Sequence, residues 1–247
     1  HFHRYAITLD IVKGKRVLDV ACGEGYGSSL IADVAEFVTG VDIALDAVNH
    51  AQKTYQKPNL IFQQGSADKL DFPAQSFDVV VSFETIEHLA EQEEMVSEIR
   101  RVLRSDGILI ISSPNRPVYS EESGEYNEFH IKELDFAEFD DLLKTQFPAI
   151  EYHGQRMLMG SVIQSIANSS ENYRIWNDNG NRLIQNSGQI IEPVYFVAIA
   201  AAKKSLLPNI ESSITYPNKL DLVKHYVGFA KWAKDLDKTI GERDSYI

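Results

Sequence analysis

A short apolar run that ends in a glycine-rich turn constrains this chain more than any other feature of its sequence. Residues 16–20 have the composition of a buried strand, and Gly23, Gly25 and Gly27 follow in close succession. Glycines between a strand and a helix let a ligand approach the backbone closely, and the amides that open the helix point toward that ligand. The turn therefore predicts a ligand site at the carboxyl end of a parallel strand.

The first two-thirds of the sequence alternate short β-rich runs with amphipathic helical stretches. This alternation is typical of a mainly parallel sheet with helices on both faces. We therefore expect an α/β fold with a Rossmann-like, seven-stranded, mostly parallel sheet. The expected strands are residues 16–20, 37–41, 60–63, 77–82, 108–111, 149–153 and 194–200, and the expected helices are residues 28–35, 45–55, 91–103 and 134–143.

The sequence that follows the fifth expected strand is less regular. Residues 114–130 are polar and contain prolines, which predicts a long loop. Residues 160–190 are rich in Asn and Ser and predict an insertion before the last strand, on the substrate side. We expect one domain over residues 1–205 and a helical extension over residues 206–247. That extension is either a helix packed on the domain or the start of a coiled coil for self-association.

The acidic composition restricts the partners of the chain. Its 247 residues include 24 Lys and Arg against 36 Asp and Glu, which gives a formal net charge of −12. Proteins that bind nucleic acid through its phosphates carry basic patches, so the balance argues against nucleic acid. The single cysteine, Cys22, excludes an internal disulfide and a zinc site made of cysteines. We find no run of the ~18 apolar residues that span a bilayer and no signal peptide, and we expect a cytoplasmic protein.

Two acidic residues distinguish this glycine turn from one that binds a pyrophosphate. Asp19 lies inside the expected strand just ahead of the glycines, where a carboxylate would repel a pyrophosphate but attract an amino group. Asp42 follows the next strand, where it can bind the two hydroxyls of a ribose. Dinucleotide-dependent dehydrogenases use a similar turn. The two acidic residues are therefore the features that distinguish this turn from theirs.

Residues 17–27 resemble the first motif of the class I S-adenosylmethionine-dependent methyltransferases, whose pattern is acidic-x-glycine-x-glycine. The resemblance continues through residues 66–68, which look like the adenine-binding turn, and through residues 76–82 and 103–109. It implies that Asp68 binds the adenine amine, although a turn cap explains that residue as well. The cofactor contacts that the resemblance implies are Asp19, Ala21, Gly23, Gly25, Asp42, Ile43, Ala67, Asp68 and Phe83.

A second chemical element, Glu84, Glu87 and His88, follows the fourth expected strand. If this segment is helical, the three residues lie on one face, where they can hold a divalent cation. His130 ends the long loop and could fold back over them. The element is similar to that of two metal-dependent branches of the family, the small-RNA 2′-O-methyltransferases and the ubiquinone-biosynthesis O-methyltransferases. This similarity implies a metal site of Glu84, Glu87, His88 and His130, suited to magnesium, manganese or iron and less to zinc.

Three interpretations of this element remain open: a metal site, a metal-free base made by His88 with Glu87, and a structural role. We favour metal-assisted O-methylation of a hydroxyl-rich small molecule or glycan. A weaker resemblance to methyltransferases of bacterial surface-polysaccharide biosynthesis supports this choice. The alternatives are metal-free N- or O-methylation of a sugar amine or lipid quinone, and a non-catalytic scaffold recruited through the C-terminal helix. Arg4 and Tyr5 either close over the cofactor or lie on the surface.

Overall fold

The computed structural model describes residues 1–124, 126–157, 175–178, 183–186 and 192–215. Every helix and strand named below lies within residues 1–210, which form one structural unit. Most of the insertion expected over 160–190 and most of the helical extension expected over 206–247 lie outside the described residues, and both stay predictions.

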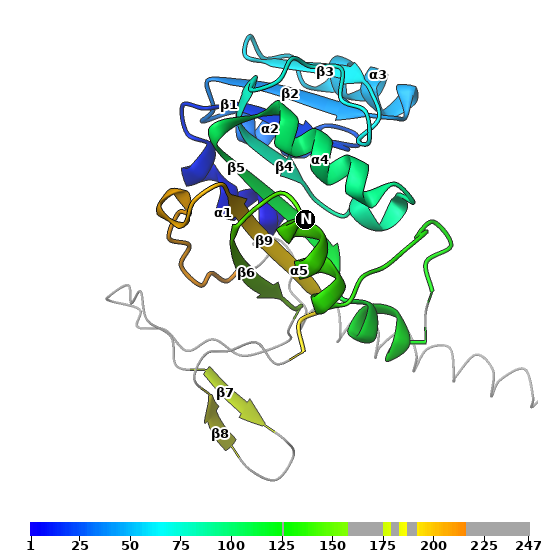
Figure 1. Cartoon of the computed structure of the whole chain (residues 1–247), viewed down its shortest axis with the longest axis vertical. Helices are drawn as coiled ribbons and strands as arrows, with labels where there is room; N and C mark the ends of the chain where they lie inside the picture. Colours follow the sequence, from blue (N-terminus) through cyan, green and yellow to red (C-terminus); the bar gives the residue numbers. More distant parts are fainter. Residues whose placement is uncertain (125, 158–174, 179–182, 187–191, 216–247) are drawn as a thin grey trace, which may run out of the picture. The chain divides into compact units, whose positions relative to one another are not determined.

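A seven-stranded sheet in the order β3-β2-β1-β4-β5-β9-β6 forms the centre of the unit (Figure 1). β1 to β5 are parallel to one another, and β9 runs antiparallel to its neighbours β5 and β6. The predicted mostly parallel seven-stranded sheet is therefore confirmed. The strands are β1 (Arg16–Val20), β2 (Phe37–Asp42), β3 (Leu60–Gln64), β4 (Phe77–Ser82), β5 (Leu103–Pro114), β6 (Ala149–Gln155) and β9 (Tyr195–Ala201).

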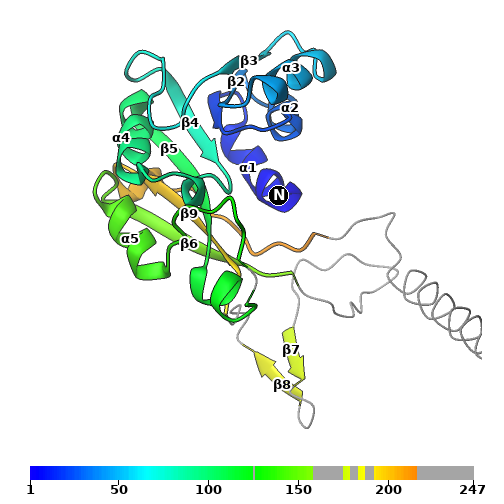
Figure 2. The same cartoon turned by 90° about the vertical axis from the view of Figure 1, so that its right-hand side faces the viewer.

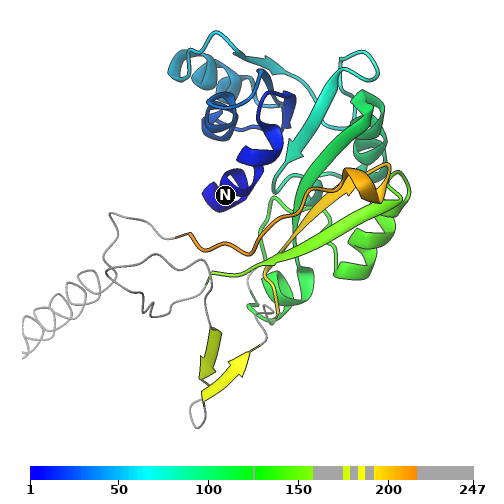
Figure 3. The ribbon, with the colours of Figure 1, turned by 90° about the vertical axis from the view of Figure 1, so that its left-hand side faces the viewer.

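Helices cover both faces of this sheet (Figures 2 and 3). On one face, α1 (Phe2–Val12), α2 (Tyr26–Ala32) and α3 (Leu45–Thr54) contribute to one apolar core. On the other face, α4 (Gln92–Val102) and α5 (Phe136–Lys144) contribute to a second core.

Neighbouring residues of the central strands point to opposite cores, as the two-residue period of a strand requires. Val79 and Val81 belong to the core under α1 to α3, and Val80 belongs to the core under α4 and α5. β4 is thus buried on both faces, which explains its unbroken apolar run.

The boundaries of several elements differ from those expected. β5 begins at Leu103, directly after α4, because the backbone of Leu103 already pairs with Phe77 before a register shift in the ladder. The expected loop over 114–130 contains a π-helical turn, η2 (Pro117–Glu121). Three shorter elements are η3 (Lys204–Leu206) and the antiparallel pair β7 (Ile175–Asp178) and β8 (Leu183–Asn186).

In the part of the chain that the structure describes, no helix has both the length and the hydrophobicity that crossing a membrane requires.

Candidate cofactor and metal site

The glycine turn after β1 is held in left-handed backbone conformations that favour glycine. Ala21, Gly23 and Gly25 have φ angles of 58°, 55° and 83°. A side chain at Gly25 would lie 2.7 Å from Ala51 and from the ring of Phe62, so this glycine is needed for packing. At Gly23, no described atom lies within 4 Å of the position that a side chain would take. The turn is thus packed against its neighbours at Gly25 and leaves space at Gly23. A turn that binds a ligand needs such space.

Ala21 takes the place of the first glycine in the acidic-x-glycine-x-glycine pattern. Its φ of 58° lies in the left-handed region, which glycine adopts more readily than a residue with a side chain.

Asp19 lies at the end of β1, beneath the turn, and only 1% of it is exposed. Its carboxylate accepts a hydrogen bond from the Ser28 hydroxyl at 2.6 Å and a longer one from the Tyr5 hydroxyl at 3.4 Å. Burial raises the pKa of Asp19 to about 7, against the opposing effect of these hydrogen bonds. A cationic group placed beside Asp19 would restore its ionised form.

Asp42 ends β2, next to the turn. Its two carboxylate oxygens accept hydrogen bonds from the backbone amides of Gly23, at 2.8 Å, and Ala44, at 2.9 Å. Because β1 and β2 are parallel neighbours, Asp42 lies at the same sheet edge as the turn. The structure therefore fixes the orientation of the predicted ribose-binding acid. Ile43, beside it, is 70% exposed.

The other predicted cofactor contacts follow β3 and β4. The Asp68 carboxylate accepts a hydrogen bond from the Ser66 hydroxyl. Ala67 is partly buried against the core. Phe83 is buried and meets the ring of Tyr5 edge-on, with 5.0 Å between centroids. The adenine-binding role of Asp68 stays a prediction.

Glu84 does not lie on a helical face with Glu87 and His88, so that part of the prediction is wrong. A short 3₁₀ turn, η1 (Ile86–His88), begins only after Glu84, whose own φ of 54° is left-handed. The Glu84 carboxylate instead accepts a hydrogen bond from the Ser112 hydroxyl at 2.8 Å and pairs with Arg4 at 3.1 Å.

Glu87, His88 and His130 come together without Glu84. Each offers one ligand atom, and these atoms lie within 4.8 Å of one another. Glu87 is fully buried, and neither of its carboxylate oxygens has a hydrogen-bond partner among the residues described. Burial raises the pKa of Glu87 to about 8, and the nearby carboxylate of Glu84 adds to the shift. A buried carboxylate without partners is costly unless a proton or a cation reaches it.

Both imidazoles in this cluster are oriented through Nδ1. His88 Nδ1 lies 2.8 Å from the carbonyl oxygen of Phe129, and His130 Nδ1 lies 2.5 Å from a Glu133 carboxylate oxygen. Because both partners accept, each Nδ1 donates, and in a neutral ring Nε2 then carries the lone pair. Nε2 of His130 uses that lone pair to accept from the side-chain amide of Asn127 at 3.1 Å. Histidines that ligate metals are commonly oriented in this way.

Backbone hydrogen bonds bring the distant His130 to this cluster. The carbonyl oxygen of Glu87 accepts from the amides of Ile131, at 2.8 Å, and Lys132, at 3.0 Å. The side chain of Gln92 adds bonds of 2.8 Å to the carbonyl oxygens of Ile86 and Lys132. The predicted approach of His130 to Glu87 and His88 thus has a defined structural cause.

Sequence reasoning did not identify several residues around the cluster. Tyr119 stacks on the ring of His130 at 5.4 Å and meets Tyr195 edge-on at 5.7 Å. Arg4 and Tyr5, whose placement the sequence left open, are both buried. No periodic pattern marks these residues, because they belong to segments far apart in the sequence.

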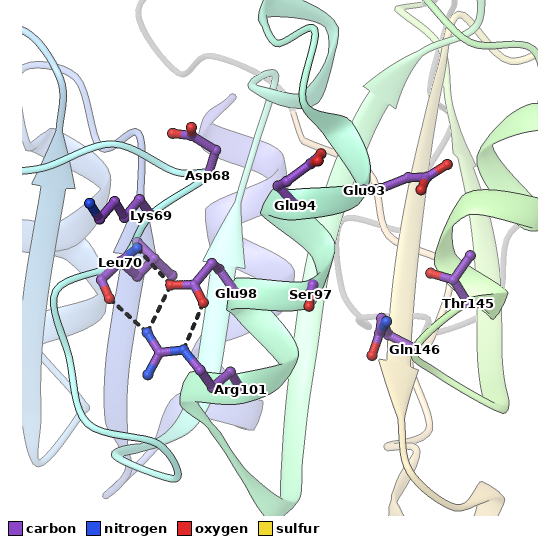
Figure 4. Close-up of a pocket in the computed structure, with 10 residues that line it drawn as sticks. All are labelled: Asp68, Lys69, Leu70, Glu93, Glu94, Ser97, Glu98, Arg101, Thr145 and Gln146. Atoms are coloured by element: carbon purple, nitrogen blue, oxygen red, sulfur yellow. Dashed lines mark hydrogen bonds and ion pairs between the residues drawn. The ribbon is translucent and has the colours of Figure 1, made fainter.

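A separate hollow of about 750 Å³ lies beside α4 (Figure 4). Among the described residues that line it, Lys69 and Arg101 carry charged nitrogen donors, and the guanidinium of Arg101 is already bound by Glu98 at 2.7 Å. It shares Asp68 with the predicted cofactor site and includes no residue of the Glu87, His88 and His130 cluster.

Comparisons with known proteins point to methyltransferases. Residues 18–111 match the model of a family described as "Methyltransferase domain". A "probable S-adenosylmethionine-dependent methyltransferase" of Mycolicibacterium smegmatis is 44% identical over 133 residues, which cover 53% of this chain and 51% of the relative. A ubiquinone biosynthesis O-methyltransferase of Glaesserella parasuis is 33% identical over 114 residues, which cover 42% and 47% of the two chains. The chain thus spans about half the length of these curated relatives.

The fold also matches solved structures. An S-adenosylmethionine-dependent methyltransferase from Mesorhizobium loti superposes with a TM-score of 0.57 at 15% identity, over 81% of this chain and 96% of that one. At this identity the likeness concerns the fold alone.

Proposed function

We propose that this chain, whose residues 18–111 match a methyltransferase domain, is a class I S-adenosylmethionine-dependent methyltransferase. It methylates a hydroxyl of a small molecule or glycan with the help of a divalent cation. The observation that carries the proposal is the position of the Glu87, His88 and His130 cluster. Glu87 and His88 follow β4, the strand that pairs in parallel with β1, so they lie at the same edge of the sheet as the glycine turn.

The residues of the turn fit the chemical groups of S-adenosylmethionine. Asp19 offers a buried carboxylate to the amino group, Asp42 offers an oriented carboxylate to the ribose, and Gly23 leaves its surroundings open. When bound, this cofactor supplies a methyl group on an activated sulfonium. The protein therefore needs to position the acceptor and to remove a proton from it.

The three-residue cluster fits a divalent cation because it combines carboxylate oxygens that have no hydrogen-bond partner among the described residues with two oriented imidazoles. Glu87 supplies the oxygens, and His88 and His130 supply Nε2 atoms, that of His130 by giving up its hydrogen bond from Asn127. Mixed oxygen and nitrogen ligands suit magnesium, manganese or iron. A cation held there would bind the acceptor oxygen and lower the cost of its deprotonation. Glu84, which pairs with Arg4 at 3.1 Å, is not among these three ligands.

An uncharged hydroxyl is the acceptor that the other observations support best. The net charge of −12 disfavours a polyanionic acceptor such as RNA. One relative is by its name an O-methyltransferase. The glycan assignment, a role in polysaccharide biosynthesis and a cytoplasmic location rest on the sequence alone.

One observation favours a metal-free alternative. Glu87 is fully buried with a pKa of about 8, which are the properties of a general base that works near neutral pH. In this alternative, Glu87 or His88 removes the proton of the methyl acceptor directly. The acceptor group can then be an amine as well as a hydroxyl.

Manganese binding tests the cation without any knowledge of the acceptor. By titration calorimetry we expect the wild-type chain to bind Mn²⁺ at one site, and we expect Glu87→Gln and His130→Ala to lose this site. His50→Ala is the matched control, because His50 is an exposed histidine on α3. Binding that survives both cluster variants would refute the site.

Methyl transfer tests the reaction. The chain is incubated with methyl-labelled S-adenosylmethionine and a panel of saccharides and catechols that carry adjacent hydroxyls. We expect EDTA to stop label transfer and Mn²⁺ to restore it. Transfer that persists in EDTA but is lost in Glu87→Gln would establish the metal-free alternative.

A further inference from the structure

Two adjacent residues of α1 reach two parts of the site. Tyr5 reaches the glycine turn, and Arg4 reaches the residue Glu84 that follows β4. Tyr5 is 5% exposed and lies against the glycine turn so closely that a side chain at Gly27 would come within 1.9 Å of its ring. Its hydroxyl lies 3.4 Å from both carboxylate oxygens of Asp19, and its ring meets Phe83 edge-on. Tyr5 therefore forms one wall of the predicted cofactor site.

Arg4 reaches the other part of the site and is 3% exposed. Its guanidinium pairs with Glu84 at 3.1 Å, and its Nε donates to the Gln155 side chain at 2.6 Å. It also lies over the ring of Tyr195, 4.4 Å from the centroid. These partners follow β4, end β6 and begin β9, so Arg4 ties α1 to the side of the sheet that carries the metal-ligand cluster.

The first turn of α1 has little local stabilisation of its own. Within the described structure, His1 makes no side-chain capping hydrogen bond, and no acidic residue lies in the first turn. A side-chain capping hydrogen bond and an acidic residue in the first turn normally stabilise the start of a helix. Tertiary contacts therefore hold this turn in place. They are those of Arg4 and Tyr5 and the ring contact of Phe2 with Tyr26, whose centroids are 5.0 Å apart. The contacts of one residue support those of the others.

We propose that Arg4 is a positioning residue for the cofactor site, and that its ion pair with Glu84 holds Tyr5 against Asp19. The affinity for the cofactor then depends on the ion pair between Arg4 and Glu84, which lies outside the cofactor site. Because such coupling is reciprocal, a group that draws Glu84 away from Arg4 should also weaken cofactor binding. This inference rests on the proposed function in one respect, since it takes S-adenosylmethionine as the ligand of Asp19.

The test measures binding of the product, S-adenosylhomocysteine, by titration calorimetry to four forms of the chain: wild type, Arg4→Gln, Glu84→Gln and the double variant. We expect each single variant to bind about tenfold more weakly, a typical coupling between sites. The double variant should bind no more weakly than the single ones, because either change removes the same ion pair. Hydrogen exchange in residues 2–12 of the complex should be faster in all three variants.

Arg116→Gln is the control, because it removes ion pairs with Glu121, Asp135 and Glu138, none of which belongs to α1. We expect it to leave the affinity unchanged. If wild type does not bind S-adenosylhomocysteine, the proposed function fails. If wild type binds and Glu84→Gln binds equally well, or if the effects of the two single variants add, the inference fails while the proposed function stands. Glu84 is 14% exposed, so Glu84→Gln decides the question alone if Arg4→Gln does not fold.

Discussion

Asp19 illustrates how one buried carboxylate can link protonation, stability and ligand binding. Its pKa is about 7 in the folded chain and near 3.8 in an unfolded one. Between these values the folded chain binds the additional proton, so the stability contributed by this group is present at low pH and is lost as pH rises from about 4 to about 7. A cationic ligand should reverse this preference, because it favours the ionised carboxylate.

Cofactor binding should therefore depend on pH through Asp19. Below pH 7 we expect the affinity for S-adenosylhomocysteine to rise about tenfold per pH unit, and above pH 7 to level off. At pH 6, calorimetry in buffers of different ionisation enthalpy should detect the release of nearly one proton. Asp19→Asn should bind weakly at every pH and release none. A pH-independent affinity in wild type would show that Asp19 is already ionised before binding.

The same substitution should stabilise the free protein. Asn removes the cost of a buried charge, so Asp19→Asn should melt at a higher temperature than wild type above pH 7, with the difference shrinking toward pH 4. Thermal melts across this range check the prediction. An equal or lower melting temperature of the variant at pH 8 would contradict it.

At the scale of the structural element, different glycines of the turn serve packing and binding. Gly25→Ala should destabilise the chain by about 1–2 kcal/mol for its left-handed backbone and by about 1–3 kcal/mol more for overlap with Ala51 and Phe62. Gly23→Ala should carry the backbone cost alone, yet lose cofactor binding because its methyl enters the open space.

Gly14→Ala is the matched control for Gly23→Ala. Gly14 has a φ of 67° and, like Gly23, no described atom near the position of a side chain, but it precedes β1 on the side away from the turn. Denaturant unfolding and calorimetry should show equal destabilisation of these two variants and a binding loss in Gly23→Ala only. A similar binding loss in both would point to a general effect on folding.

Elements were predictable where one physical pattern determined them. The apolar run of β4 is buried on both faces, and its bounds follow from the sequence. α1 was not predicted because its buried residues include Arg4 and Thr8, so it lacks a continuous apolar stripe. The helical placement of Glu84 failed because a positive φ depends on tertiary contacts, here with Ser112 and Arg4, that no spacing rule contains.

At the scale of the whole molecule, the sheet explains why residues far apart in sequence form one site. The carboxyl ends of β1, β2 and β4 lie at one edge, and each is followed by a predicted site residue. Parallel pairing alone predicts this gathering. The long loop that brings His130 to Glu87 follows no such rule, because its position depends on backbone amides that any sequence carries.

Some of the acidic residues behind the net negative charge have a place in the proposed site. Asp19 and Asp42 face the predicted cofactor, and Glu87 faces the predicted cation. The proposed function gives these three carboxylates a role, and the remaining negative charge still disfavours a polyanionic acceptor.

A crystal structure with S-adenosylhomocysteine and Mn²⁺, with data collected at the manganese absorption edge, tests the central claim most directly. The account predicts one anomalous peak bound by Glu87, His88 Nε2 and His130 Nε2, with the homocysteine amine at Asp19 and the ribose at Asp42. A bound product without a peak at this cluster, or a product whose amine lies away from Asp19, would contradict it.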